Sequence, residues 1–185
     1  TQNPVFFNPA TGLHEWIQKR LESAVAHQCD ALTTVSEYIT EHFRAIAGKD
    51  KAHTLSNGYD EADFTGIEPC RPERFRMLYT GTLYGGAKAD CFLKAVSAVL
   101  REHPEWESDF EIVFRMPCSK ALEMMIREEG LEKVAHTREP LPYRETLMRQ
   151  TEAAVLLLFI APGPNSRVTV TQKVFEYLRS GRPIL

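Results

Sequence analysis

The sequence predicts a doubly wound α/β domain, in which helices cover both faces of a parallel sheet. Three observations lead to this prediction. From residue 76 onward, short apolar runs alternate with amphipathic helix patterns, which is the order that βαβ crossovers produce. Capping residues and glycines mark where several of these helices begin and end. The 185 residues are 43% hydrophobic and 25% charged, so the chain can bury a sizeable core.

The first part of the chain fits a separate unit. Its helices and strands are expected in the order helix 13–27, strand 29–36, helix 37–48 and strand 53–60. Asn57-Gly58 marks a turn, and residues 61–76 combine glycine, proline and mixed charge in the manner of a linker. We therefore place a domain boundary near Asp60.

The predicted sheet begins after this boundary. Strand 76–81 is followed by helix 87–102, strand 110–114, helix 119–130 and a short strand at 133–136. Ser119 is the expected N-cap of the second of these helices, and Gly130 ends it. The periodicity of the apolar residues changes between strand and helix at each step, which supports parallel pairing.

The remaining elements follow a loop that contains two prolines. They are helix 143–150, strand 153–160, a long loop at 161–171, a closing helix and the start of a strand at 183–185. Thr171 is a plausible N-cap of the closing helix, and Val174, Phe175 and Leu178 form its apolar stripe. Gly181 is the expected stop of that helix.

Charge and cysteine usage exclude several classes of protein. The formal net charge of -3 and the pI of about 6.1 do not favour a nucleic-acid partner. The four cysteines, Cys29, Cys70, Cys91 and Cys118, show neither zinc-ligand spacing nor a disulfide framework, and we expect reduced, mostly buried thiols. The longest apolar run, residues 153–162, is shorter than the roughly 20 residues of a membrane span. We therefore expect a soluble, cytoplasmic protein.

Ligand sites in such sheets lie at the carboxyl ends of the strands. Loop 81–88 is rich in glycine and precedes a helix, which suits a phosphate group, although a flexible strand-to-helix turn is the alternative. Neither the dinucleotide nor the Walker pattern is present. Loop 161–171 is longer than a structural connection needs. Glu176, about one turn into the following helix, could accept two sugar hydroxyls, or it could be an ordinary solvent-exposed glutamate.

Four stretches together carry a family resemblance. CDALTTVSEYITEHF, HTLSNGYDEADF, LYTGTLYGG and KVFEYLRSGRPIL, in this order and spacing, resemble the glycosyltransferases of the GT-B fold, the large group often called family 4 or group 1. The likeness covers essentially the whole chain. Its most specific parts are the linker signature Asn57-Gly58-Tyr59-Asp60 and the terminal Lys-x-x-Glu-Tyr-Leu-x-x-Gly-x-Pro pattern.

The resemblance implies two Rossmann-like domains that face each other. The amino-terminal domain would bind the acceptor, and the carboxy-terminal domain would bind the nucleotide-sugar donor. Residues 1–60 would then be the C-terminal remnant of the acceptor domain with the linker, and residues 61–185 a donor-binding domain truncated at its C-terminus. On this view the sequence is a fragment.

The resemblance also assigns site residues. Glu176 matches the glutamate that holds the ribose hydroxyls, and Arg138 to Leu141 match the segment that reads the base. The remaining residues would contact the donor diphosphate; they are Gly81, Thr82, Lys88 and the backbone around Ser166, Val168 and Thr169, with Asn165 or Ser166 as possible side-chain contacts. No catalytic residue is assigned, because the acceptor-side histidine of the family would lie in sequence that is absent.

Three positions depart from the family pattern. Thr82 stands where the family often has arginine, and Val168 stands where many members have glutamate, which leaves the phosphate and donor-sugar contacts open. Lys173, just before the Glu-Tyr-Leu motif, is typical of subfamilies that lack that acid. Arg115 stands where many members have glycine, and it fits a pocket cation and a structural ion pair equally well. Lys88, if exposed, also fits a solvated charge at a helix N-terminus.

These features lead to two function hypotheses. The first is a glycosyltransferase fragment that takes part in moving a sugar from a nucleotide-diphosphate sugar to a glycan, lipid-linked or small-molecule acceptor, without a metal or other cofactor. The second is a non-catalytic nucleotide-diphosphate-binding or partner-binding module of the same fold. A receiver-type domain would need an acidic cluster after the strand at 76–81, and the sequence has none there. We expect self-association through an exposed cleft, and peripheral membrane attachment is an option for the full-length protein.

Overall fold

The computed structural model describes residues 12–70, 72, 74–83, 89–163, 166 and 169–185. They divide into two compact units. Unit 1 contains the described residues of Thr1–Asn57 and Pro162–Thr171, and unit 2 contains those of Gly58–Ala161 and Gln172–Leu185.

Unit 1 pairs two short parallel strands with two helices. The elements are α1 (Leu13–Gln28), β1 (Leu32–Thr34), α2 (Glu37–Ala47) and β2 (Ala52–Thr54). Ser36 begins α2, and its Oγ accepts a hydrogen bond from the backbone N–H of Ile39 at 3.4 Å. The hydroxyl of Thr40 lies 2.6 Å from that of Thr34 and 2.7 Å from that of Thr54, so hydroxyl contacts join α2 to both strands.

Helix α1 leaves an apolar row uncovered among the described residues. Leu13, Ile17, Leu21 and Val25 recur at intervals of four residues, and their exposed fractions range from 40% to 71%. Unit 1 therefore buries less apolar surface than the sequence of this helix would allow.

Unit 2 is built on a parallel sheet of four strands in the order β5-β4-β3-β6. The strands are β3 (Phe75–Thr80), β4 (Phe110–Arg115), β5 (Ala135–Arg138) and β6 (Val155–Leu156). Every pair in the sheet is parallel, which requires a crossover between successive strands. The predicted doubly wound class is confirmed.

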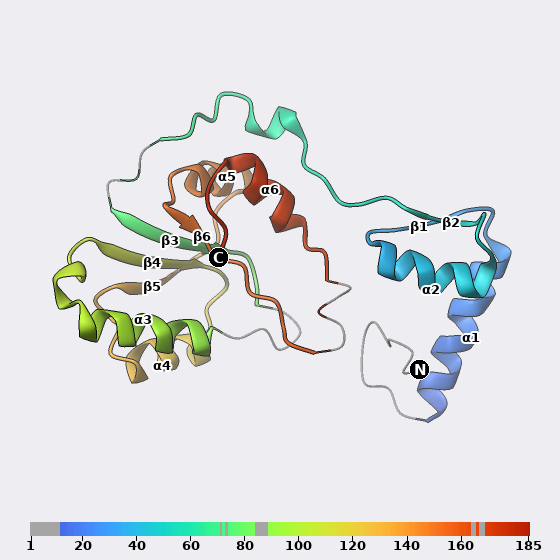
Figure 1. Ribbon diagram of the computed structural model, residues 1–185, viewed down its shortest axis with the longest axis horizontal. Helices are drawn as coiled ribbons and strands as arrows, with labels where there is room; N and C mark the ends of the chain where they lie inside the picture. Colours follow the sequence, from blue (N-terminus) through green and yellow to red (C-terminus); the bar gives the residue numbers. More distant parts are fainter. Residues whose placement is uncertain (1–11, 71, 73, 84–88, 164–165, 167–168) are drawn as a thin grey trace. The chain divides into compact units, whose positions relative to one another are not determined.

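Helices cover both faces of this sheet (Figure 1). Helices α3 (Asp90–Glu102) and α4 (Lys120–Glu128) cover one face, and α5 (Tyr143–Thr151) and α6 (Gln172–Ser180) cover the other. Alternate residues of β3 point to opposite faces. Met77 and Tyr79 therefore join the core under α3 and α4, whereas Leu78 packs with Tyr177 of α6 on the other side.

The segment predicted as a linker is attached to α5. Residues Glu61–Phe64 form a short 3-10 helix, and Phe64 and Ile67 pack on Leu147 in a small buried cluster. Arg144 of α5 also donates a hydrogen bond to the carbonyl of Thr65 at 2.6 Å. Apolar burial and backbone recognition together order this stretch.

Three predicted strands are longer than the observed ones: 29–36 and 53–60 correspond to β1 and β2, with three residues each, and 153–160 corresponds to β6. Strand β6 has two residues, whereas the sequence predicted eight. Beyond it the backbone N–H of Leu158 donates to the carbonyl of Leu185 at 2.8 Å, and a parallel bridge joins Leu156 to Ile184. Within the run, Ala153, Leu156 and Leu157 are buried but Ile160 is 41% exposed, so the apolar stretch extends beyond the strand and beyond the core.

The closing helix buries a different face from the predicted one. Leu178 is 62% exposed, whereas Glu176, Tyr177 and Ser180 are buried. The predicted stripe is wrong because the hydroxyl of Tyr177 reaches the end of β3, and this contact fixes the rotation of the helix. Thr171 lies at the expected N-cap position, but its Oγ1 is buried without a hydrogen-bond partner in the described part of the chain.

Three of the four cysteines and both tryptophans are exposed. The cysteines are Cys70, Cys91 and Cys118, so the expectation of mostly buried thiols is wrong. Trp106 of unit 2 stacks on His103, with ring centroids 4.2 Å apart, and in unit 1 the guanidinium of Arg20 lies 5.0 Å from the ring of Trp16. None of the helices in the described ranges combines the length and apolarity that crossing a bilayer requires.

Candidate functional site

The candidate site lies in unit 2, where β3 ends and the first turns of α6 pass beside it. Thr80 is the last residue of β3, and Gly81 follows it with a φ of 94°. The backbone N–H of Gly81 donates to the carbonyl of Arg115 at 2.9 Å, which extends the ladder by one step beyond the strand. A positive φ at this point favours glycine and turns the chain sharply at the carboxyl edge of the sheet.

Gly81 leaves room for the amine of Lys173. A Cβ atom at Gly81 would lie 2.8 Å from Cε and 3.0 Å from Nζ of Lys173, so any larger residue would displace the lysine. The amine donates a hydrogen bond to Oη of Tyr79 at 2.9 Å and lies 4.2 Å from the centroid of that ring. The end of the lysine side chain is therefore held against the glycine backbone.

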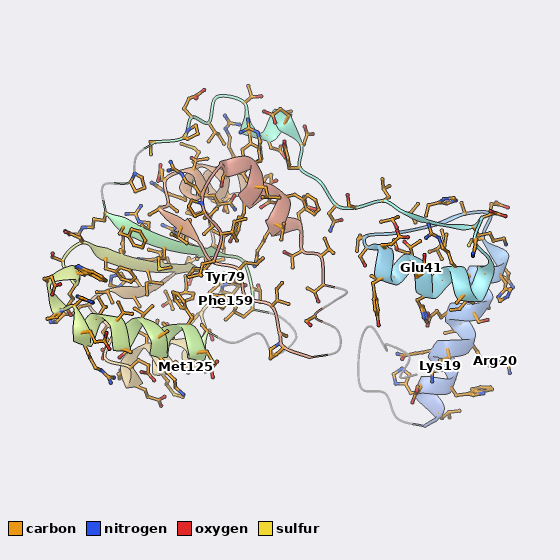
Figure 2. The ribbon with its side chains drawn as sticks, in the orientation of Figure 1. Lys19, Arg20, Glu41, Tyr79, Met125 and Phe159 are labelled. Atoms are coloured by element: carbon orange, nitrogen blue, oxygen red, sulfur yellow. The ribbon has the colours of Figure 1, made fainter. Side chains whose placement is uncertain are left out.

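Tyr79 is anchored on its other sides. Its hydroxyl donates to the carbonyl of Thr82 at 2.8 Å, and Figure 2 shows its ring next to that of Phe159, with centroids 5.2 Å apart. A buried aromatic ring with both a hydrogen bond and ring contacts is a rigid support. Tyr79 thus connects the loop after β3 to the amine of Lys173.

Burial disfavours the charged form of Lys173. It lowers the pKa of this amine to about 8, and the carboxylate of Glu176 opposes the shift. Lys173 and Glu176 are three residues apart on α6, so both side chains lie on one face of the helix.

Glu176 is a buried carboxylate with defined donors. It is 8% exposed, and Oε1 accepts a hydrogen bond from the hydroxyl of Tyr143 at 3.3 Å. Burial raises the pKa of Glu176, while hydrogen bonds from Gln150 and Tyr143 and the charge of Lys173 oppose that rise. The alternative of a solvent-exposed glutamate is wrong. Burial, with the nearby charge of Glu176, also raises the pKa of Tyr143 to about 12.

Helix α5 carries both Tyr143 and Gln150. Tyr143 and Gln150 are seven residues apart, two turns along one face of α5. The side chain of Gln150 is fully buried, and its Nε2 also donates to Oγ1 of Thr80 at 3.3 Å. The hydroxyl of Tyr177 lies 3.2 Å from the same Oγ1, so α5, α6 and the end of β3 share one polar network.

This arrangement presents an amine, a glycine backbone and a carboxylate along one edge of the sheet. The amine and the backbone at Gly81 suit an anionic group, and a carboxylate accepts hydrogen bonds from hydroxyls. Across the described residues, His, Cys, Asp and Glu side chains do not gather in threes that could hold a metal ion.

The structure brings some of the predicted site residues together. Gly81 contacts Lys173, which lies one turn before Glu176, and Thr82 receives the hydrogen bond from Tyr79. Lys88, Asn165 and Val168 lie outside the described residues. Ser166 and Thr169 belong to unit 1, where Oγ of Ser166 donates to the carbonyl of Gly163 at 2.8 Å.

The two residues predicted to read the base lie at the end of β5 and in the loop after it. Arg138 is exposed and ends the strand, and its side chain lines a hollow that Arg115 and Arg149 also line. The carbonyl of Leu141 accepts a hydrogen bond from Oγ1 of Thr146 at 3.3 Å. The hydrogen bond to Glu176 described above comes from Tyr143 of α5 and not from this segment.

Four residues of this site were not assigned from the sequence. Tyr79 lies in a strand with the pattern of an ordinary core position, so no local signal marks it. Lys173 could have been found from its spacing of three residues from Glu176. Tyr143 and Gln150 share a spacing of seven residues, which places them on one helix face, but their partner on α6 is not visible in the sequence.

Comparison with known proteins establishes the fold. No protein-family model and no curated protein sequence matches this chain. Among solved structures, WaaG, a glycosyltransferase involved in lipopolysaccharide biosynthesis, aligns with a TM-score of 0.63 and 13% identity over 94% of this chain and 49% of its own. TarM aligns with a TM-score of 0.61 and 12% identity over 98% and 33%, respectively. Sucrose-phosphate synthase from Thermosynechococcus elongatus aligns with a TM-score of 0.61 and 11% identity over 95% of this chain and 45% of its own.

These proteins are GT-B glycosyltransferases, so the chain has the fold of that class. It spans between a third and a half of the length of the three structures. Because the identities are only 11% to 13%, the comparison shows a shared fold.

Proposed function

We propose that this chain, which has the fold of GT-B glycosyltransferases, is part of a glycosyltransferase and binds its nucleotide-diphosphate sugar. The observation that carries the proposal is the pairing of a buried carboxylate, Glu176, with the amine of Lys173 held against Gly81. The two groups lie at the carboxyl edge of a parallel sheet, where ligands bind in doubly wound folds. Crystal structures of S. aureus TarM and of the pneumococcal transferase GtfA contain UDP, which supports a nucleotide ligand for this fold.

Glu176 would accept hydrogen bonds from the two ribose hydroxyls. Its carboxylate already accepts a hydrogen bond from Tyr143, so little side-chain freedom would be lost on binding. The base would lie against the segment from Arg138 to Leu141. These roles rest on the resemblance of the sequence and on the position of Glu176 in the polar network.

The diphosphate would lie against the loop that starts at Gly81 and Thr82. In this proposal Lys173 takes a share of the neutralisation for which the family uses an arginine at the position of Thr82, and Lys88 supplies a further positive charge. A cation at this place stabilises the negative charge that develops on the departing nucleotide diphosphate. The sugar would pass to a glycan, a lipid-linked glycan or a small molecule.

Transfer needs donor and acceptor to be held in one orientation. Because this chain spans at most about half of the GT-B structures it matches, we expect no transfer by the 185-residue chain alone. Polysaccharide biosynthesis in the cytoplasm, with the full-length protein at the membrane surface, is the setting that we propose.

The second candidate is a binding module that retains the nucleotide site without transfer. Thr82 is the observation that favours it, because the loop lacks the arginine that the family commonly uses. Sugar transfer by the intact parent protein would exclude this candidate.

The test is thermal stabilisation of the purified chain by UDP, GDP and ADP. We expect one nucleotide to raise the melting temperature in a concentration-dependent manner, because a ligand that binds only the folded state stabilises it. Glu176→Gln preserves the shape of the side chain and should weaken the affinity about tenfold or more, as should Glu176→Ala. Glu128→Ala, which removes an exposed carboxylate from α4, is the matched control and should leave the affinity unchanged.

Two results would contradict the proposal. One is the absence of stabilisation by any of the three nucleotides, both in this chain and in its full-length parent. The other is a nucleotide that binds Glu176→Gln and the unsubstituted chain equally well.

A further inference from the structure

A second group of charged residues lies on the α5 side of the sheet and takes no part in the network around Glu176. Four arginines, Arg76, Arg115, Arg138 and Arg149, surround a hollow of about 160 Å³ together with Glu111. We call this group the arginine pocket. Leu78 and Val113 also line it, so it lies against the strands themselves.

Strand register explains why the arginines converge. Arg76 pairs with Glu111 across β3 and β4, and Arg115 pairs with Arg138 across β4 and β5. Neighbouring strands lie about 4.8 Å apart, and side chains two residues apart share a face. Two guanidinium groups at the ends of adjacent strands are therefore forced onto the same face, and Arg149 approaches from α5.

Two of the four charges are balanced within the structure. Arg76 forms an ion pair with Glu111 at 2.6 Å, and Arg149 forms one with Glu152 at 2.6 Å. Arg115 donates only to the carbonyl of Glu139, at 3.2 Å, and neither Arg115 nor Arg138 has an ion pair among the described residues. The pocket therefore holds two guanidinium charges without a carboxylate partner.

This arrangement is unfavourable for the empty protein. Like charges directly opposite one another on a sheet destabilise it. Partial burial of Arg115, together with the charges of Arg149, Arg138 and Arg76, lowers the pKa of its guanidinium. An anion bound between Arg115 and Arg138 would remove the repulsion.

We propose that the arginine pocket is a binding site for a phosphate group, either free inorganic phosphate or the phosphate of a small metabolite. Guanidinium groups bind phosphate oxygens in pairs of hydrogen bonds, and a doubly charged phosphate matches the two unbalanced arginines. Since one water molecule takes about 30 Å³ of liquid volume, the hollow admits a phosphate group. The pocket shares Arg138 with the segment proposed above to read the base, whereas Arg76, Arg115 and Arg149 have no part in the proposed nucleotide site.

The test compares thermal stabilisation by phosphate and by chloride at equal ionic strength. We expect phosphate, and not chloride, to raise the melting temperature of the 185-residue chain at millimolar concentration. Arg115→Gln and Arg138→Gln should each weaken the apparent affinity for phosphate about tenfold. Arg127→Gln, an exposed arginine of α4, is the matched control and should bind phosphate normally. Glycerol 3-phosphate in a second arm separates the sources, because a metabolite site should bind the ester more tightly than free phosphate.

A further readout separates binding from a structural role. Without phosphate and at low salt, Arg115→Gln should melt at a higher temperature than the unsubstituted chain, because it removes the repulsion. The proposal is overturned if phosphate stabilises no more than chloride, or if Arg115→Gln and Arg127→Gln respond alike. Arg115→Gln should retain any stabilisation by nucleotide, and Glu176→Gln should retain the stabilisation by phosphate, so failure of one proposal is distinguishable from failure of the other.

Discussion

At the scale of single residues, Lys173 and Glu176 form a pair whose charged states are both penalised by burial. The pKa of the lysine is lowered to about 8, and that of the glutamate is raised. Such shifts are common where a protein is arranged to receive a charged ligand, although structural networks also produce them. The amine can therefore change its charge in a pH range in which most lysines remain protonated.

The affinity for a nucleotide diphosphate should depend on the charge of Lys173. Below pH 8 the amine is protonated and attracts the diphosphate. Above pH 8 binding must also take up a proton, so we expect the affinity to fall by up to about tenfold per pH unit. Titration calorimetry between pH 7 and 9.5 measures this slope. Lys173→Arg, which stays charged throughout, should show a flat profile, and an equal slope in both proteins would rule out this role.

Gly81 should be intolerant of a side chain for two separate reasons. Its positive φ strains any other residue by about 1 kcal/mol or more, and a Cβ would push the end of Lys173 away from Tyr79. Gly130→Ala is the matched control, because that glycine has a φ of 69° and an added methyl group there would have no atom within 4 Å. In chemical denaturation, Gly81→Ala should lower the free energy of unfolding by about 1 kcal/mol more than Gly130→Ala does. When Lys173→Ala is introduced into both variants, the losses of unfolding free energy caused by Gly81→Ala and Gly130→Ala should become equal.

At the scale of elements, the rotation of α6 is set by one phenol. The hydroxyl of Tyr177 accepts a hydrogen bond from the backbone N–H of Thr80 at 3.3 Å, and its ring packs with Leu78 and Leu156. This contact connects the helix that carries Lys173 and Glu176 to the strand that precedes Gly81. The spacing of the site residues therefore depends on it.

Tyr177→Phe should lower the free energy of unfolding by about 1–3 kcal/mol, because it leaves the buried N–H of Thr80 without an acceptor. Tyr143→Phe is the comparison, since Tyr143 is 47% exposed and its hydroxyl donates to a side chain. We expect a loss below about 1 kcal/mol there. Urea denaturation of both variants measures the two losses, and a larger loss for Tyr143→Phe would show that the network is anchored elsewhere.

The sequence predicted the elements better than the faces they bury. Helix α4, expected at 119–130 with Ser119 as its cap, spans Lys120–Glu128, and Oγ of Ser119 accepts the expected hydrogen bond from the N–H of Leu122 at 3.3 Å. Capping and periodicity are local, so one chain segment reveals them. The buried face of α6 was mispredicted because a distant hydroxyl contact decides it. Likewise, the resemblance indicated Glu176, but Tyr143 and Gln150 become visible only when α5 and α6 are brought together.

At the scale of the whole molecule, the two units differ in how much apolar surface they bury. The three apolar core clusters found among the described residues all belong to unit 2. The buried residues of unit 1 in the same ranges are Ala26, Thr34, Thr40 and Ala52. Because apolar burial is the main favourable contribution to folding, unit 1 should be the less stable part.

Hydrogen exchange should show this difference directly. We expect the amides of α1 and α2 to exchange at least about tenfold faster than those of α3 and β4, because each kcal/mol of local stability changes the protection several-fold. Mass spectrometry of peptides from the two units measures the rates in one sample. Equal protection in both units would mean that the chain unfolds as a single cooperative body.

The tryptophans give the molecule a built-in optical reporter for each unit. Trp106 stacks on the imidazole of His103, whereas Trp16 has an arginine over its ring. The sequence contains no tryptophan besides these two, so Trp16→Phe leaves an emission that arises from unit 2 alone. Its emission will change when unfolding separates the indole from the imidazole, and the unfolding of unit 2 can be followed without a label.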